Sequence, residues 1–224
     1  MFEKRINMFT GHFGSGKTEV AVNFAFRLSD IYERVAIVDF DIVNPYFRAV
    51  DARQKLEKRG ICVIAPLFAN TNIDIPALPP EINTLFENKE YRVVFDVGGD
   101  DIGAKALSRY RDSILKDEYE MYVVINTKRP MTDTVEKIMR MIAEIEASSR
   151  LKATKLVNNT NLLKDTSPED IIRGYELINT VSYRLGIEIA FTSVFPGIAD
   201  GIEGKVGTEI LRLYKYIKLP WDYE

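Results

Sequence analysis

The sequence predicts an α/β fold, in which helices cover both faces of one doubly wound, mostly parallel sheet. Two observations predict it: short apolar runs alternate with longer segments of helical period, and most of the runs are continuously apolar. Continuous apolar runs are typical of strands buried on both faces, as in parallel sheets. The 224 residues, 46% of them hydrophobic, suffice for a large core. We expect a single domain over residues 1–224.

Seven apolar runs are the expected strands. The third contains Cys62, the single cysteine of the chain. One cysteine excludes an internal disulfide and a structural zinc site made by cysteines, and we expect it to be buried as a small hydrophobic residue. The runs are RINMFT (5–10), RVAIVDFD (34–41), ICVIAP (61–66), YRVVFDVGG (91–99), YEMYVVINT (119–127), ATKLVNN (153–159) and IEIAFTSVF (187–195).

The segments between the runs have helical periodicity. Behind the first run, apolar residues recur every four positions at Val20, Phe24 and Leu28. In the segment 132–149, Asp133 is the expected N-cap of a helix with one apolar stripe. These segments are the expected crossovers between parallel strands.

Two further helices are expected in the last third of the chain. Ser167 is an N-cap, Pro168 takes the first helical position, and Gly186 ends the helix. The final helix is expected over residues 201–218. The basic, amphipathic end of this segment fits a helix that packs on the sheet, or one that lies on a membrane surface.

The stretch TGHFGSGKTE, residues 10–19, matches the phosphate-loop pattern G-x-x-x-x-G-K-[ST]. Glycines let the backbone curl so that successive N–H groups point at an anion, and the following helix adds its partial positive charge. A lysine here reaches the β- and γ-phosphates, and the hydroxyl after it ligates Mg²⁺. The glycine spacing does not fit a dinucleotide site. The expected nucleotide-binding residues are Gly11, His12, Phe13, Gly14, Ser15, Gly16, Lys17, Thr18 and Glu19.

Carboxylates follow two of the expected strands. Asp39 and Asp41 end the second run, and Asp96 ends the fourth. The carboxyl ends of parallel strands lie at one edge of a sheet, so all three are expected near the phosphates. Carboxylates hold Mg²⁺ and the waters around it, and one close to the γ-phosphate orients the attacking water. Asp96 is the expected metal-side acid.

The segments TGHFGSGKTEVAVNFA, VAIVDFDIVNP and VVFDVGGDD resemble the MinD/ParA/nitrogenase-iron-protein class of P-loop ATPases. The resemblance implies a mostly parallel sheet of seven or eight strands. It implies that Asp39 and Asp96 are metal-side acids of two moving loops, with Asp100 in the second loop. It also implies that Asp41 positions the attacking water, so that Lys17 and Asp41 are the catalytic residues.

The resemblance also implies a base site. KLVNNTN, residues 155–161, reads like N-K-x-D, with Asn158 at its first position and Asn161 at its last. Guanine would need an aspartate at the last position, whereas asparagine suits adenine, which offers a donor beside an acceptor. ATP is therefore expected rather than GTP. Phe195 and Pro196 follow the seventh run and are expected to pack on the base.

Two departures from this class matter. Many members carry a lysine where this chain has His12, and that lysine reaches the partner's nucleotide in a dimer. The resemblance still allows a homodimer, but not one that depends on that lysine. The iron protein has a cluster-binding cysteine where this chain has Gly103, so no iron–sulfur cluster is expected. The expected cofactors are ATP and Mg²⁺.

Two functions fit these expectations best. The first is a nucleotide-gated switch ATPase that acts on a protein partner. The second is an ATP-dependent small-molecule synthetase that activates a carboxylate, as dethiobiotin synthetase and amidase-type synthetases of the same class do, with a pocket under the loop 68–80. A metabolite kinase is a third. Arg48 and Arg53 are candidates for phosphate contact, against the alternative of solvated helix charges.

The bulk charge argues against other partners. The net charge is −3 and the sequence pI is about 5.5, which does not favour nucleic acid. No stretch approaches the ~18 apolar residues that span a bilayer, and the N-terminus lacks the pattern of a signal peptide. We therefore expect a cytoplasmic protein without membrane insertion.

Overall fold

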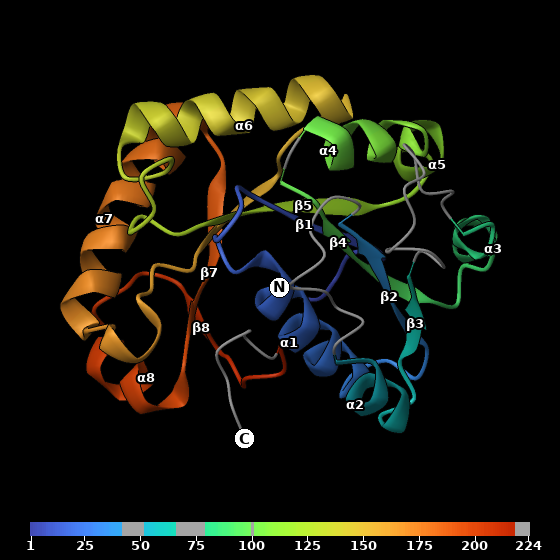
Figure 1. Ribbon diagram of the computed structural model, residues 1–224, viewed down its shortest axis with the longest axis horizontal. Coiled ribbons are helices and arrows are strands. Elements are labelled where there is room, and N and C mark those ends of the chain that lie inside the picture. Colours follow the sequence, from blue (N-terminus) through green and yellow to red (C-terminus); the bar gives the residue numbers. More distant parts are fainter. Residues whose placement is uncertain (42–51, 66–78, 100, 218–224) are drawn as a thin grey trace, which may run out of the picture.

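The computed structural model describes residues 1–41, 52–65, 79–99 and 101–217, without the side chains of residues 101 and 102. The described residues form an eight-stranded sheet in the order β3-β2-β4-β1-β5-β6-β7-β8, and every pair of neighbours is parallel (Figure 1). The strands are β1 (Ile6–Thr10), β2 (Val35–Phe40), β3 (Cys62–Ile64), β4 (Arg92–Val97), β5 (Tyr119–Ile125), β6 (Lys155–Asn158), β7 (Glu188–Val194) and β8 (Glu209–Arg212).

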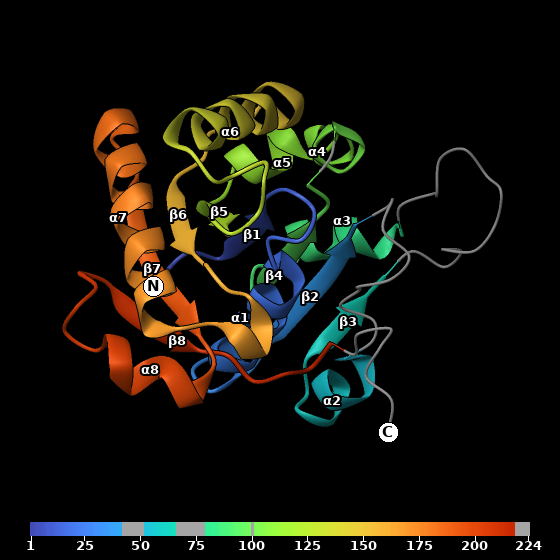
Figure 2. The same cartoon turned by 60° about the vertical axis from the view of Figure 1, so that its left-hand side comes forward.

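Helices cover both faces of this sheet, as predicted. Figures 1 and 2 show α1 and α2 on one side and α4, α5 and α6 on the other. The helices are α1 (Lys17–Ser29), α2 (Arg53–Lys58), α3 (Glu81–Glu87), α4 (Asp101–Ser108), α5 (Arg111–Leu115), α6 (Val135–Ser149), α7 (Pro168–Leu185) and α8 (Pro196–Ile202).

All seven predicted strands are present, and the central ones are buried on both faces. In β2, Ala36 and Val38 pack into the core under α3 to α7, whereas Val35 and Ile37 pack into the core under α1 and α2. This double burial explains why the runs are continuously apolar. The first helix buries Val20, Phe24 and Leu28, as its four-residue period predicts.

The boundaries of α7 are as predicted, and those of α6 are shifted by one residue. The Ser167 hydroxyl accepts from the Asp170 N–H, and Gly186 ends α7 in a left-handed conformation. In α6 the N-cap is Thr134, whose side chain accepts from the Lys137 N–H. Asp133 instead pairs with the Lys137 ammonium at 2.7 Å, so the prediction of Asp133 as the N-cap is wrong.

The predicted final helix over 201–218 is also wrong. The helix there, α8, ends at Ile202, and residues 209–212 form the edge strand β8. Leu211 and Leu213 are buried while Arg212 and Tyr214 between and after them are exposed. This alternation is the period of a half-buried edge strand, so neither the helix packed on the sheet nor the membrane-lying helix describes these residues.

Cys62 is exposed rather than buried. It lies on β3, which is the edge strand beside β2, and the next residue, Val63, carries the inward-facing position. Successive residues of a strand point to opposite faces of the sheet, so Cys62 lies on the face opposite to Val63 and is exposed there, and the expectation of burial is wrong. Across the described ranges, no helix is long and apolar enough to span a bilayer.

Candidate functional site

The phosphate-loop motif forms the turn between β1 and α1. Gly11 has φ +145° and Gly16 has φ +83°, a region that favours glycine. A Cβ on Gly11 would overlap the carbonyl oxygen of Val124, and a Cβ on Gly16 would overlap the side chain of Asn159. The two motif glycines are therefore required by conformation and by close packing at once.

The register of the sheet brings the predicted acids together. Asp39 of β2 is paired with Asp96 of β4, and Asp96 is also paired with Phe9, two residues before Gly11. Asp39 and Asp96 have the same strand parity as the residues under α1, so they face the start of that helix. Asp41 follows β2, and its N–H donates to Asp39 Oδ1 at 3.2 Å.

Lys17, the first residue of α1, inserts among these acids. Its Nζ lies 2.5 Å from Asp41 Oδ2 and 3.8 Å from Asp96 Oδ1. Burial pushes the pKa of Lys17 down, but the carboxylates of Asp96, Asp41 and Asp39 outweigh it, so the pKa of Lys17 is raised. Lys17 is therefore a charged ammonium, held by carboxylates directly after the glycine loop.

Asp96 is the most buried of the three acids, with no exposed surface. Burial raises its pKa and so does Asp41, against the lowering effects of Lys17 and the Thr18 hydroxyl. In the part of the chain that the structure describes, the oxygens of Asp96 have only weak partners: Lys17 Nζ at 3.8 Å from Oδ1 and the Thr18 hydroxyl. A buried carboxylate left in this way demands a further cation or donor.

These residues fit a magnesium ion that is shared with a phosphate. Within the described stretches, no group of three or more His, Cys, Asp and Glu side chains is arranged to hold a metal by itself. Mg²⁺ in phosphate sites is bound by one or two protein groups, with phosphate and water completing its shell. The unsatisfied Asp96 beside the buried Thr18 hydroxyl matches that demand.

Asn159 joins the phosphate loop to the neighbouring strand ends, and the motif analysis missed it. Its Nδ2 donates to the Ser15 carbonyl at 2.6 Å, and its Oδ1 accepts from the Ser193 hydroxyl at 2.8 Å. Its position is the one that forbids a Cβ on Gly16. Asn159 therefore fixes the loop from the side of β6 and β7. The sequence carries a signal for this residue, because Asn159 stands within KLVNNTN, the stretch that resembles N-K-x-D.

Asn158, the predicted first base-site residue, is fully buried. Its Nδ2 donates to the Ile171 carbonyl at 3.2 Å, and its Oδ1 accepts from the Thr160 N–H at 3.2 Å. The side chain lies on the α7 side of β6, opposite to Asn159. Its amide is used within the fold, and its contact with a base stays a prediction.

The other base-site candidates lie at neighbouring strand ends. Asn161 is half-buried, donates from Nδ2 to the Asn159 carbonyl at 2.8 Å and accepts from the Leu163 N–H. Phe195 is half-buried against the core under α1, and Pro196 is exposed at the first position of α8. Their contact with a base stays a prediction.

Glu19 lies in the motif but does not face the loop. Its carboxylate accepts from the N–H groups of Tyr216 at 2.8 Å and Ile217 at 3.2 Å. Asn23, one turn later, holds the backbone of Tyr214 through both its amide atoms. Burial raises the pKa of Glu19 against the lowering effect of these amides. Its side chain therefore anchors the C-terminal segment to α1, and a contact of Glu19 with nucleotide stays a prediction.

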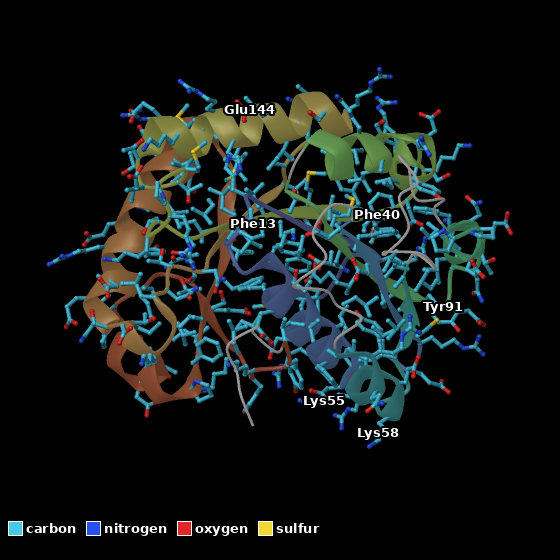
Figure 3. The ribbon with its side chains drawn as sticks, in the orientation of Figure 1. Phe13, Phe40, Lys55, Lys58, Tyr91 and Glu144 are labelled. Atoms are coloured by element: carbon cyan, nitrogen blue, oxygen red, sulfur yellow. The ribbon has the colours of Figure 1, made fainter. Side chains whose placement is uncertain are left out.

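The loop after β4 packs tightly on the phosphate loop. A Cβ on Gly99 would overlap the Gly11 carbonyl oxygen, and one on Gly103 would lie 2.7 Å from the Gly98 carbonyl oxygen. This approach of backbones explains glycine, rather than a cluster-binding cysteine, at position 103. His12 is half-buried, and Phe13, labelled in Figure 3, is 70% exposed at the tip of the loop.

Some predicted residues fall outside the description. Arg48, Asp100 and nearly all of the loop 68–80 are not described. Arg53 is described, and its Nη1 donates to Glu57 at 3.1 Å and to the Val63 carbonyl at 3.3 Å. These bonds support the alternative of a helix-surface charge for Arg53.

Comparisons with known proteins place the fold. No family model matches the chain, and no curated protein matches it. Among solved structures, the cell division protein FtsY of Thermotoga maritima matches with a TM-score of 0.56 and 20% identity, over 85% of this chain and 62% of its own. FtsY of Mycoplasma mycoides matches with 0.52 and 15%, over 86% and 60%.

The signal recognition particle receptor FtsY of Elizabethkingia anophelis matches with a TM-score of 0.52 and 14% identity, over 96% of this chain and 64% of its own. The chain thus spans little more than three fifths of the length of these relatives. At such identities the likeness shows the P-loop NTPase fold alone. The resemblance to the MinD/ParA class stays a prediction.

Proposed function

We propose that this protein is a P-loop ATPase that binds Mg-ATP at the carboxyl edge of its sheet and works as a nucleotide-gated switch on a protein partner. The observation that carries the proposal is the buried Lys17 ammonium, held 2.5 Å from Asp41 and 3.8 Å from Asp96 under a glycine loop. A lysine with only a structural role does not require a glycine loop beside it, whereas a phosphate site requires both the lysine and the loop.

Each residue of the site then has a role. The loop amides and Lys17 bind the β- and γ-phosphates, and Thr18, Asp39 and Asp96 hold Mg²⁺. When bound, Mg²⁺ supplies positive charge to the phosphates. A phosphate that reaches Lys17 competes with Asp41 for the ammonium, so Asp41 is released to orient the attacking water. The same exchange couples nucleotide binding to the position of Asp41, which is the proposed switching step.

The base site supports ATP rather than GTP. Because Asn159 is the residue that contacts the phosphate loop, the N-K-x-D pattern moves by one position and ends at Leu162. Guanine offers two N–H groups side by side, which call for a carboxylate. Neither Leu162 nor Asn161 supplies one.

Calorimetric titration tests nucleotide binding. Mg-ATP is expected to bind in the micromolar range, Mg-GTP at least tenfold more weakly, and Lys17→Ala at least 100-fold more weakly. Lys116→Ala, at an exposed position just before β5, is the matched control and is expected to bind as the wild type does. Absence of binding by the wild type at millimolar nucleotide would reject the proposal.

Sedimentation mass tests the switch. The Asp41→Ala protein is expected to trap ATP, so it should associate in Mg-ATP and stay monomeric in Mg-ADP. Equal masses in both nucleotides would contradict nucleotide-gated pairing. The synthetase alternative would then be tested by adding carboxylate metabolites and measuring whether ATP turnover rises.

A further inference from the structure

The loop between β5 and α6, residues 126–134, is held rigidly beside the phosphate loop. Asn126 organises it: its Nδ2 donates to the Asn161 carbonyl at 3.0 Å, and its Oδ1 accepts from the Lys128 N–H at 3.0 Å. Its carbonyl oxygen accepts from the Thr132 hydroxyl at 2.7 Å and from the Arg129 N–H at 3.1 Å. The backbone of Arg129 is therefore fixed by its own loop.

The side chain of Arg129 reaches across to the phosphate loop. Its Nε donates to the Gly14 carbonyl at 3.0 Å. A Cβ on Gly14 would lie 3.4 Å from that nitrogen, so the guanidinium lies directly against the glycine. Gly14 is in the middle of the motif and has φ +78°. The guanidinium is thus placed at the phosphate cradle by two ordered loops.

The charge of Arg129 has no carboxylate partner in the described residues. The neighbouring cations do: Lys128 pairs with Asp170 at 2.5 Å, and Lys137 pairs with Asp133 at 2.7 Å. No ion pair of the described chain includes Arg129, and its side-chain hydrogen bond there is the one to Gly14. Arginine presents five N–H donors in a planar fork, so the outer nitrogens remain available to an anion.

The charge balance of the site calls for such a cation. Among the described residues, the carboxylates of Asp39, Asp41 and Asp96 surround the single ammonium of Lys17. A magnesium-bound nucleoside triphosphate adds about two more negative charges, spread over its terminal oxygens. A guanidinium beside the loop offsets that charge and matches phosphate with two parallel hydrogen bonds.

We propose that Arg129 is a phosphate-binding residue that contacts the terminal phosphate of the nucleotide bound to the same chain. The inference rests on the proposed nucleotide binding and adds a specific contact that distinguishes triphosphate from diphosphate. Its Nε bond to Gly14 orients the fork, and the outer nitrogens bind the anion.

The test compares a non-hydrolysable ATP analogue with ADP, both with Mg²⁺, by calorimetric titration. Arg129→Ala is expected to weaken the analogue 10- to 100-fold and ADP less than threefold. Arg129→Lys keeps a charge without the fork and is expected to fall between wild type and Arg129→Ala. Arg140→Ala, an exposed arginine on α6, is the matched control and is expected to leave both affinities unchanged.

Two results would overturn the inference while nucleotide binding stands. One is unchanged affinity of Arg129→Ala for both nucleotides. The other is an equal loss for both, together with a lower thermal midpoint of the nucleotide-free protein, which would mean that Arg129 only props the loop. If the wild type binds neither nucleotide, the proposed function itself fails.

Discussion

Two buried clusters of charge lie at opposite ends of the central strand β1, and they are built in opposite ways. At the amino end, Arg5 and Lys89 both bond to the carboxylate of Asp117. At the carboxyl end, the single Lys17 serves three acids. The first cluster has cations in excess around one carboxylate, and the second has carboxylates in excess around one cation.

The two clusters differ in how fully hydrogen bonds satisfy their charged groups. Arg5 also donates to the carbonyls of Leu85 and Tyr91, both at 3.0 Å. Burial would raise the pKa of Asp117, but its bonds to Arg5 and Lys89 lower it to about 2. The pKa of Asp96 is raised instead, and its oxygens lack good donors in the described chain. The amino-end cluster is balanced within the fold, whereas the excess of carboxylates at the carboxyl end is what the proposed Mg-nucleotide site would use.

Breaking the amino-end cluster is expected to cost the most stability. Arg5→Ala removes one of the donors to the half-buried carboxylate of Asp117, which keeps Lys89, and it removes the donor to two carbonyls, which together costs about 3 kcal/mol of unfolding free energy. Denaturant unfolding without nucleotide measures it. Arg34→Ala removes an exposed pair with Glu90 and is the control, with an expected loss below about 1 kcal/mol. Equal losses would remove the contrast between buried and exposed pairs.

The pH dependence of the same cluster follows from Asp117. Its pKa is lower in the folded state than in the unfolded state, so its contribution is present above about pH 4 and is lost as pH falls towards 2. Asp117→Asn is therefore expected to be less stable than the wild type by about 2 kcal/mol near neutral pH, and the gap should close in acid. Unfolding curves from pH 2 to 7 would show it. A gap that stays constant over that range would contradict the lowered pKa.

Glu19 sharpens the comparison because it lies in the phosphate-loop motif but works as a structural residue. Glu19→Gln weakens charge-assisted bonds to the N–H groups of Tyr216 and Ile217, with an expected loss of about 1 kcal/mol of unfolding free energy. Its affinity for Mg-ATP should stay within twofold of the wild type. A tenfold loss of affinity at unchanged stability would return Glu19 to the nucleotide site.

The smallest change in stability is expected at Asp96. Because its folded-state pKa is raised, the charged form of Asp96 costs stability above its unfolded pKa, and that cost is relieved as pH falls through the folded pKa. Asp96→Asn removes the cost of the buried charge but also the strongest carboxylate interaction of Lys17, so the nucleotide-free protein at pH 7 should stay within about 1 kcal/mol of the wild type. A loss above 2 kcal/mol would mean that Asp96 is structural, as Asp117 is.

Much of this arrangement could be predicted from the sequence, because it follows from local patterns. The seven apolar runs predict their strands since both faces are buried, and the phosphate-loop motif joins a strand, a turn and a helix that are consecutive in the sequence, from Ile6 to Ser29. The placement of Asp39 and Asp96 needs only the rule that parallel strands end at one edge. Such features depend on neighbours in the sequence.

The features that the local patterns do not reveal have the opposite origin, because they depend on contacts between residues far apart in the sequence. Asn158 and Asn159 are adjacent and chemically identical. The strand that leads to them is buried on both faces, so no local pattern tells which of the two side chains faces the phosphate loop. Glu19 is explained only by a segment almost 200 residues later in the chain. The side-chain partner of Arg129, Gly14, likewise lies more than 100 residues away. The edge strand β8 is different, because its period of two was readable and the basic residues obscured it.

The most direct test of the central claim is the gain in unfolding free energy that Mg-ATP gives to the wild type and to Asp96→Asn. At nucleotide concentrations about 100 times the dissociation constant of the wild type, the wild type is expected to gain about 2.7 kcal/mol. Asp96→Asn is expected to gain less than half of that, although its nucleotide-free stability is close to that of the wild type. Equal gains in both proteins, or no gain in the wild type, would contradict a carboxyl edge built for a magnesium-bound nucleotide.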